Sequence, residues 1–248
     1  MPRRNFSTAD FSRTKKRTSD KLIFISCEGV ETEEVYFDIL ASLFHNIRSK
    51  IKIVSVRGDY MLLDQKTQEE KQKQNMSSPK YVFQRMQTYL AENQEYYQLR
   101  ENSEDEYWLV MDIDDHTSAA KIDEWNHVLK QCDSRGYSYA ISNPNFEFWL
   151  YLHHCILTEE DHMHCVNEIH PYCKDPYFLD HMKKVGVFLH GKSHKKPLES
   201  DYTLEKVIHA MKQAKSLEQA EDSYPKCNLG STVYQLIEKF WELESEKK

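Results

Sequence analysis

The rest of the chain is organised around residues 107–115, which read YWLVMDIDD. Five largely apolar residues lead directly into Asp112, Ile113, Asp114 and Asp115, a pattern that predicts a buried strand ending in a group of carboxylates. Alternate side chains of a strand share a face, so Asp112 and Asp114 are expected to point the same way, whereas Ile113 points into the core. Carboxylates and water are the ligands that Mg²⁺ and Mn²⁺ prefer. The stretch therefore suggests a divalent-metal site.

The same carboxylates also fit a purely structural role. Aspartate is common after strands because its side chain caps a following helix, and Asp115 or Thr117 could cap a helix expected to begin near Ser118. An Asp-x-Asp pattern by itself does not separate the two interpretations. A further carboxylate delivered by another strand would favour the metal site.

The length and composition are those of a folded globular protein. The 248 residues suffice for one large domain, or for one domain with an elaboration. No apolar run approaches the roughly 20 residues of a membrane span, and the first residues are basic and polar, unlike a signal peptide. A cytoplasmic location is therefore expected. The net charge of -7 does not by itself suggest nucleic-acid binding, for which the distribution of charge matters more than its sum.

The six cysteines contain no Cys-x-x-Cys pair, which argues against a disulfide scaffold. A cluster of histidines and cysteines in residues 153–173 contains zinc-type ligands, but its spacing matches no zinc motif. Two interpretations stay open, a structural zinc site and ordinary helix and loop residues. The cluster consists of His153, His154, Cys155, His162, His164, Cys165, His170 and Cys173.

Two basic segments are candidates for contacts to phosphates. Residues 1–20 form a basic arm that could lie on phosphates, fold on a partner or remain a disordered tail. Residues 183–196 are also basic, and their two glycines predict a loop. The candidate nucleic-acid contacts are Arg3, Arg4, Arg13, Lys15, Lys16, Arg17, Lys192, Lys195 and Lys196, with His190 and His194 beside the last three.

Strand and helix patterns alternate through the first 155 residues. Strands are expected at residues 22–27, 51–56, 107–112 and 137–142, with helical patterns at 32–44, at 81–98 and around Trp125. Asn143-Pro144 then suggests a helix start, with Asn143 as the cap and Pro144 at the first helical position. From about residue 155 the strand signals fade, and helices at residues 204–217 and 233–243 are expected to close the chain.

This alternation predicts an α/β fold with a mostly parallel sheet of about four strands flanked by helices. We divide the chain into the basic arm at residues 1–20, an α/β core at 21–155 and a helical C-terminal elaboration at 156–248.

The ends of the expected strands carry the candidate site. The first strand ends in Glu28-Gly29, and Gly29 allows a sharp exit. Glu147 lies one turn after the fourth strand, where it could face the same crevice as Asp112. Ligands of open α/β sheets bind outside the carboxyl ends of the strands, so Glu28, Asp112 and Asp114 are expected to converge. Unpaired carboxylates would repel one another there, which implies a bound cation or a raised pKa.

These motifs resemble a known family. A strand ending in Glu-Gly, then a helix, and a later strand ending in Asp-x-Asp are similar to the Toprim fold of topoisomerases, primases and old-type nucleases. More closely, the sequence resembles the RloB family of bacterial defence proteins over residues 3–155 and weakly over 228–236. The motifs that carry this likeness are the basic arm, Cys27-Glu28-Gly29, Glu31-Thr32-Glu33, Tyr36-Phe37, Asp112-Ile113-Asp114, and Ser142-Asn143-Pro144-Asn145-Phe146-Glu147 followed by Trp149.

The resemblance implies an antiphage, abortive-infection nuclease that needs Mg²⁺ or Mn²⁺ and acts with an ATPase of the ABC or SMC-like type. By matching motif positions, Glu28 is implied as a general acid or base, Glu28, Asp112 and Asp114 as the metal-binding carboxylates, and Glu147 as an additional acidic position. The implied substrate is RNA, tRNA in particular, or DNA. Asn145 and the carboxyl half depart from the family pattern, so the substrate stays open.

The chemistry is consistent with this implication. Metal-dependent nucleases neutralise charge on the phosphoryl oxygens and activate a water, and a nearby carboxylate can move a proton. The sequence has no glycine-rich phosphate loop, so ATP hydrolysis would belong to a separate subunit. The alternatives are a noncatalytic sensor or regulatory subunit that binds the ATPase, and a topoisomerase-like or primase-like enzyme. A homo-oligomer is also left open.

Overall fold

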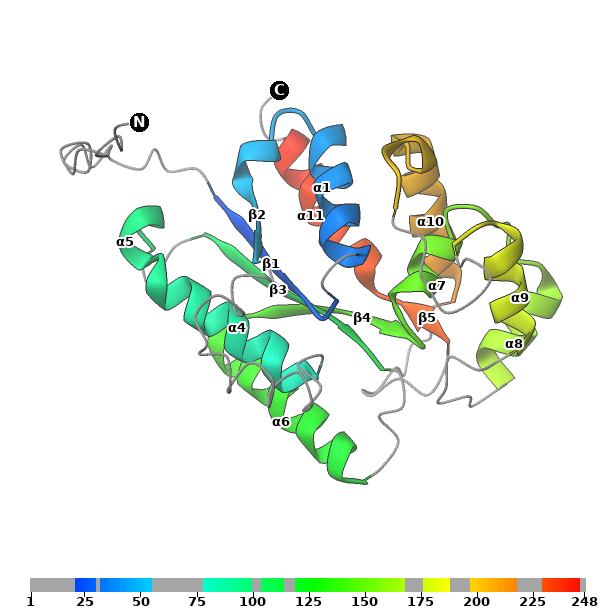
Figure 1. Ribbon diagram of the computed structural model, residues 1–248, viewed down its shortest axis with the longest axis horizontal. Coiled ribbons are helices and arrows are strands. Elements are labelled where there is room, and N and C mark those ends of the chain that lie inside the picture. Colours follow the sequence, from blue (N-terminus) through cyan, green and yellow to red (C-terminus); the bar gives the residue numbers. More distant parts are fainter. Residues whose placement is uncertain are drawn as a thin grey trace, which may run out of the picture.

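A five-stranded sheet forms the centre of the molecule, in the order β2-β1-β3-β4-β5 (Figure 1). The computed structural model describes residues 21–29, 32–54, 78–99, 104–113, 119–167, 176–187, 197–217 and 229–245. The strands are β1 (Ile23–Cys27), β2 (Ile51–Val54), β3 (Glu106–Asp112), β4 (Ser138–Asn143) and β5 (Gly230–Ser231). The first four run parallel, and β5 pairs antiparallel with β4. The expected α/β class and mostly parallel sheet are confirmed.

Helices cover both faces of this sheet (Figure 1). One face carries α4 (Pro79–Glu92) and α6 (Ala119–Arg135), and the other carries α1 (Thr32–Leu43) and α11 (Val233–Ser245). The remaining helical segments are α5 (Gln94–Tyr97), α7 (Phe146–Tyr151), α8 (Glu159–Asn167), α9 (Pro176–Lys184), α10 (Leu204–Ser216), and the 3-10 turns η2 (Arg48–Lys50) and η3 (Glu199–Asp201). No helix in the described ranges is long and apolar enough to cross a membrane.

The apolar run of β3 is explained by burial on both faces. Trp108 and Val110 pack into the core beneath α1 and α11, whereas Leu109 and Met111 pack against α4 and α6. A strand buried on both sides needs a continuous apolar sequence, not an alternating one. Ile113, just after the strand, was predicted to point into the core, and it is buried in the cluster that contains residues of α4 and α6.

The order of the strands reverses at β1. The chain leaves β1 for β2 on one side, then crosses to β3 on the other side, and β1 is hydrogen-bonded to both neighbours. Such a reversal in an open parallel sheet leaves a crevice at the carboxyl ends of the two strands, where ligands bind in this class of fold. The residues at these ends are Glu28 and Asp112.

The expected helix start at Asn143-Pro144 is wrong. Asn143 is the last residue of β4 and pairs with Gly230 of β5, which keeps it in the sheet. Pro144 follows through a cis peptide bond, and α7 begins only at Phe146, with Asn145 in the N-cap position.

The C-terminal half also differs from expectation, because it contributes the fifth strand. β5 comprises only Gly230–Ser231 and has no apolar run that a sequence pattern could show. The closing helices α10 and α11 are present as predicted, and their buried residues belong to the same core as β1 and α1. Helix α9 extends to Lys184, so the segment expected to be a loop from residue 183 begins inside a helix. The helix expected at 81–98 is divided into α4 and α5 at Asn93.

Candidate active site at the carboxyl ends of β1 and β3

Glu28 and Asp112 meet at the crevice between β1 and β3. The carboxylate of Glu28 accepts a hydrogen bond from the backbone N–H of Asp112, with Oε2 and N 3.0 Å apart. The backbone N–H of Glu28 donates to the carbonyl of Val110 at 3.1 Å, which extends the strand pairing by one residue. Glu28 is buried and Asp112 is half-buried. The structure therefore brings the Glu28 carboxylate against the backbone of Asp112, so the two residues that the sequence placed on different strands lie side by side at this crevice.

Further charges surround the end of β1. Burial raises the pKa of the Cys27 thiol well above its usual value, and the charges of Glu33, Glu34 and Asp112 act in the same direction. Arg85 opposes them and lowers that pKa. Glu33, Glu34 and Arg85 therefore lie within electrostatic reach of the last residue of β1, in addition to the carboxylates expected there from the sequence.

Glu33, which the sequence placed in the Glu31-Thr32-Glu33 motif without a role in the site, is a buried carboxyl in the first turn of α1. Its Oε1 accepts the backbone N–H of Gly29 at 2.8 Å. Burial is the main cause that raises the pKa of Glu33 to about 7, and the charges of Glu147 and Glu34 raise it further. Hydrogen bonds from the backbone N–H groups of Glu33 and Gly29 act in the opposite direction. A carboxyl with a pKa near neutrality can both give and take a proton.

Gly29 is the sequence feature that points to the position of the Glu33 carboxylate. A Cβ atom at position 29 would collide with the Glu33 carboxylate, so only glycine leaves room for this contact. The Glu-Gly pair thus does more than allow a turn.

Arg85 approaches the crevice from the opposite face of the sheet. It is buried on α4, and its Nη1 donates to the carbonyl of Cys27 at 2.5 Å. The same helix is joined to β1 a second time, because Ser26 Oγ donates to the carbonyl of Val82 at 3.1 Å. In the sequence, the only sign of this role is that Arg85 lies on α4 between the apolar residues Val82 and Met86, both of which are buried in the structure.

Glu147 lies within electrostatic reach of the start of α1. It is buried on α7, and its charge raises the pKa of both Glu33 and Tyr202. All six residues of α7 are buried, so Glu147 is not on a solvent-exposed side of its helix. Glu147 therefore lies close enough to Glu33 for the two charges to interact, which connects α7 electrostatically with the start of α1.

A family model described as RloB-like protein matches residues 23–240. The chain belongs to the RloB-like family. The match runs from the first residue of β1 into α11 and so includes the C-terminal half, in which the sequence motifs resembled the family only weakly. The mostly parallel sheet flanked by helices is consistent with a Toprim-like fold. No curated protein and no solved structure matches the chain.

The described part of this RloB-like protein contains only part of the expected metal-binding set. Asp114 lies outside the described residues, and so do Arg3, Arg4, Arg13, Lys15, Lys16, Arg17, Lys192, Lys195 and Lys196. Within the described ranges, no three His, Cys, Asp or Glu side chains form a group that could hold a metal ion. Glu28 and Asp112 carry carboxylate oxygens, the type of ligand that suits Mg²⁺, and the metal site expected from the sequence also includes Asp114.

His153, from the histidine and cysteine cluster, is a structural residue. Its Nδ1 lies 3.0 Å from the carbonyl of Trp149 and must carry the proton, so its Nε2 accepts the Tyr36 hydroxyl proton at 2.9 Å. Burial lowers the pKa of His153 to about 3, and the ring stays neutral. The ordinary interpretation of the cluster therefore holds for this member. The side chains of His164, Cys165, His170 and Cys173 lie outside the described part of the chain.

Proposed function

We propose that this RloB-like protein is a metal-dependent nuclease, the effector of an antiphage abortive-infection system, and that it acts with an ABC-type or SMC-like ATPase. The observation that carries the proposal is the meeting of Glu28 and Asp112 at the point where the strand order reverses. Open parallel sheets bind their ligands at this place. The proposed substrate is a phosphodiester of RNA, with tRNA preferred over DNA because of the resemblance to Toprim effectors that cleave tRNA.

The roles of the residues follow from their surroundings. A bound Mg²⁺ or Mn²⁺ would neutralise charge on the phosphoryl oxygens and lower the pKa of a water. Asp112, with Asp114 beyond it, would hold the ion. Glu28 would move the proton, since its carboxylate is oriented by the Asp112 backbone N–H. Glu33 is the second candidate for proton transfer because its pKa is about 7.

Arg85 supports this arrangement electrostatically. Several carboxylates close together disfavour one another's ionisation, and a buried guanidinium that stays protonated offsets part of that repulsion. The hydrogen bond from Arg85 to the Cys27 carbonyl holds this positive charge at the backbone of Cys27, the residue before Glu28.

Metal binding is the first prediction to test. Asp112→Asn should lower Mn²⁺ affinity at least tenfold in calorimetric titration of the full chain. The fold should be retained, because removal of one like charge relieves repulsion in the metal-free protein. Asp38→Asn is the matched control, since Asp38 is exposed on α1. Equal Mn²⁺ affinity in the Asp112 variant and the control would rule out the site.

Cleavage is the decisive test of function. We expect wild type, with its ATPase partner and Mg²⁺, to cleave tRNA, and Glu28→Gln and Asp114→Asn to lose more than a hundredfold in rate. Other RNA and DNA serve as comparison substrates, and a chelator should abolish the reaction. Cleavage that survives both substitutions or the chelator contradicts the mechanism. A wild-type protein that binds the ATPase and Mn²⁺ but cleaves none of the substrates would instead be a regulatory subunit.

A further inference from the structure

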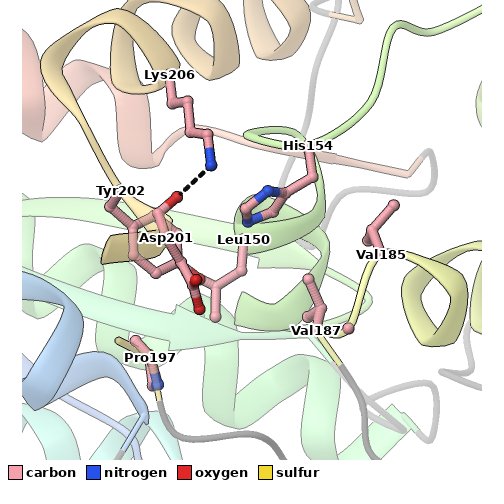
Figure 2. Close-up of a pocket in the computed structure, with 9 residues that line it drawn as sticks. Leu150, His154, Val185, Val187, Pro197, Asp201, Tyr202 and Lys206 are labelled. Carbon is pink, nitrogen blue, oxygen red and sulfur yellow. Dashed lines mark hydrogen bonds between the residues drawn. The ribbon is translucent and has the colours of Figure 1, made fainter. Parts of the chain in front are cut away.

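A small cavity of about 150 Å³ lies beside α7, where Leu150, Val185 and Val187 contribute apolar walls (Figure 2). Its lysine is already engaged, because the ammonium of Lys206 donates to the backbone carbonyl of Asp201 at 2.9 Å, as the dashed line in Figure 2 shows. The cavity therefore gives no sign of a particular ligand.

An aromatic patch lies at the amino ends of the strands, at the edge of the sheet opposite the candidate active site. Phe24 is fully buried at its centre, with the ring centroids of Tyr97 and Tyr107 at 5.3 and 5.5 Å. The apolar side chains around Phe24 are only partly buried. Tyr96, which packs on Tyr97 with ring centroids 4.8 Å apart, is 79% exposed. The aromatic patch consists of Leu22, Tyr89, Tyr96, Tyr97, Leu99 and Tyr107.

Carboxylates surround the aromatic patch. Glu92 and Glu95 are exposed on α4 and α5, which carry its tyrosines, and Glu104 is exposed just before β3. Glu106 already binds a cation, since its Oε1 lies 2.6 Å from Nζ of Lys21. Opposite charges attract across such distances, so this rim favours a cationic partner.

The rings of the aromatic patch also accept a cation. Nζ of Lys52 lies 5.9 Å from the centroid of the Tyr97 ring. The faces of tyrosine rings attract lysine and arginine in this way. Partly exposed apolar surface of this kind marks an interaction site, and the occupant that fits it is both cationic and aromatic.

The basic arm at residues 1–20 of the same chain has this composition. It contains six arginines and lysines against two aspartates, with Phe6 and Phe11 between the cations. It joins the described part of the chain at Lys21, next to Leu22 of the aromatic patch. The backbone N–H of Leu22 donates to Oδ1 of Asp105 at 2.9 Å, which fixes this junction beside the acidic rim.

The basic arm is long enough to reach the aromatic patch. Phe11 precedes Leu22 by 11 residues. An extended chain spans roughly 3.3–3.6 Å per residue, so this length exceeds 30 Å. The rings of Tyr97 and Tyr107 both contact Phe24, which follows Leu22 by two residues, so they lie well within this reach.

We propose that the basic arm docks on the aromatic patch of its own chain when no nucleic acid is bound. Phe11 would lie on the tyrosine rings, and the neighbouring cations would lie at Glu92, Glu95 and Glu104. The inference does not depend on the proposed nuclease function. Phosphates would compete with these carboxylates for the same cations, so a bound nucleic acid would release the arm.

The first test locates Phe11 in the full chain. The variant Phe11→p-benzoylphenylalanine, which carries a photo-cross-linking side chain, is irradiated and the linked peptides are identified by mass spectrometry. We expect links to residues 89–107 of the same chain, which a mixture of isotope-labelled and unlabelled protein distinguishes from links between two copies. Links confined to a second copy would assign the aromatic patch to a dimer. The absence of links to residues 89–107 would overturn the proposal.

Trypsin measures the docking equilibrium, because cleavage at residues 13–17 requires the free arm and follows the population of the open form. Phe11→Ser and Tyr96→Ser should each raise the cleavage rate about tenfold, the effect of removing roughly half of a buried aromatic contact. Ile156→Ser, at another exposed apolar position, should leave the rate unchanged. Higher salt should raise the wild-type rate, because it screens the rim carboxylates.

The trypsin result would contradict docking if wild type, Phe11→Ser and Tyr96→Ser were cleaved at equal rates. Tyr96 is exposed, so its replacement leaves the fold intact, and an unchanged melting temperature confirms this. A wild-type cleavage rate that falls as the protein concentration rises would assign the contact to a second copy instead.

Discussion

Gly29 and Glu33 show how one missing side chain shapes the acidic crevice. A Cβ at position 29 would occupy the place of the Glu33 carboxylate. This carboxylate accepts a hydrogen bond from the backbone N–H of Gly29. Glycine therefore permits a carboxyl to be buried at the start of α1, within electrostatic reach of Glu147. The consequence is a group that changes charge near neutral pH.

The pH dependence of stability should report this group. Below pH 4.5 the Glu33 carboxyl is protonated in both the folded and the unfolded protein. Between pH 4.5 and about 7 the folded protein keeps a proton that the unfolded chain releases, so the free energy of unfolding falls as the pH rises. The pKa shift corresponds to a loss on the order of 3 kcal/mol, fully developed above pH 7.

Glu33→Gln should remove this loss. We expect the variant to be more stable than wild type at pH 8 and to approach it at pH 4.5, in urea unfolding with chelator present. Asp38→Asn, at an exposed position of the same helix, should follow the wild-type profile. Parallel profiles for wild type and Glu33→Gln would show that folding does not change the pKa of Glu33.

At the scale of single elements, β5 links the C-terminal segment to the sheet with very few residues. It pairs through Ser142 with Ser231 and Asn143 with Gly230, and the two serine hydroxyls are 2.9 Å apart. Beyond the strand, the Thr232 hydroxyl accepts the backbone N–H of Ile141 at 2.9 Å. A side chain thus continues the hydrogen bonding where the short strand ends.

Thr232→Val should test this link. Valine keeps the shape and removes the acceptor, which leaves the buried N–H of Ile141 without its partner. Loss of such a partner costs about 1–3 kcal/mol in the free energy of unfolding. Thr232→Ser retains the hydroxyl and is the matched control, to be compared by urea denaturation. A valine variant as stable as the serine variant would mean that the hydroxyl contributes little.

At the scale of the whole molecule, helices cover both faces of the sheet, and the acidic residues of the candidate site lie at the carboxyl ends of β1 and β3. The basic residues that would bind a nucleic-acid backbone lie in residues 1–20 and 188–196, outside the described ranges. Because the whole chain carries a net charge of -7, these segments are the expected source of attraction for phosphates.

Deletion of residues 1–17 removes Arg3, Arg4, Arg13, Lys15, Lys16 and Arg17. If all of them contact the phosphates of single-stranded RNA, the slope of log binding constant against log salt should become shallower by about 4. Binding of tRNA at several salt concentrations measures it. Replacement of the same residues by glutamine keeps the length of the arm and should give the same change. An unchanged slope would assign the phosphate contacts to Lys192, Lys195 and Lys196 instead.

The amino-acid pattern alone predicted the class of the fold and the two carboxylates at the carboxyl ends of β1 and β3. A strand covered on both faces must be apolar throughout, so IFISC and YWLVM were recognisable without any knowledge of their neighbours. Parallel strands also have their carboxyl ends at one edge, which is why Glu28 and Asp112 could be expected at one crevice before the structure showed the hydrogen bond between them.

Features that depend on distant parts of the chain became visible only once the chain was seen folded. Asn143 is the last residue of a strand and not a helix cap, because it pairs with Gly230. Gly230 is distant in the sequence, so the local pattern around Asn143 gives no sign of this pairing. Glu33 and Arg85 looked like ordinary helical residues, and their importance comes from the burial that α1 and α4 impose at the end of β1. The pocket of His154, Asp201 and Lys206 forms where α7, η3 and α10 meet. Local sequence sets which residues are apolar, whereas the environment of a charged group is set by segments that fold against it.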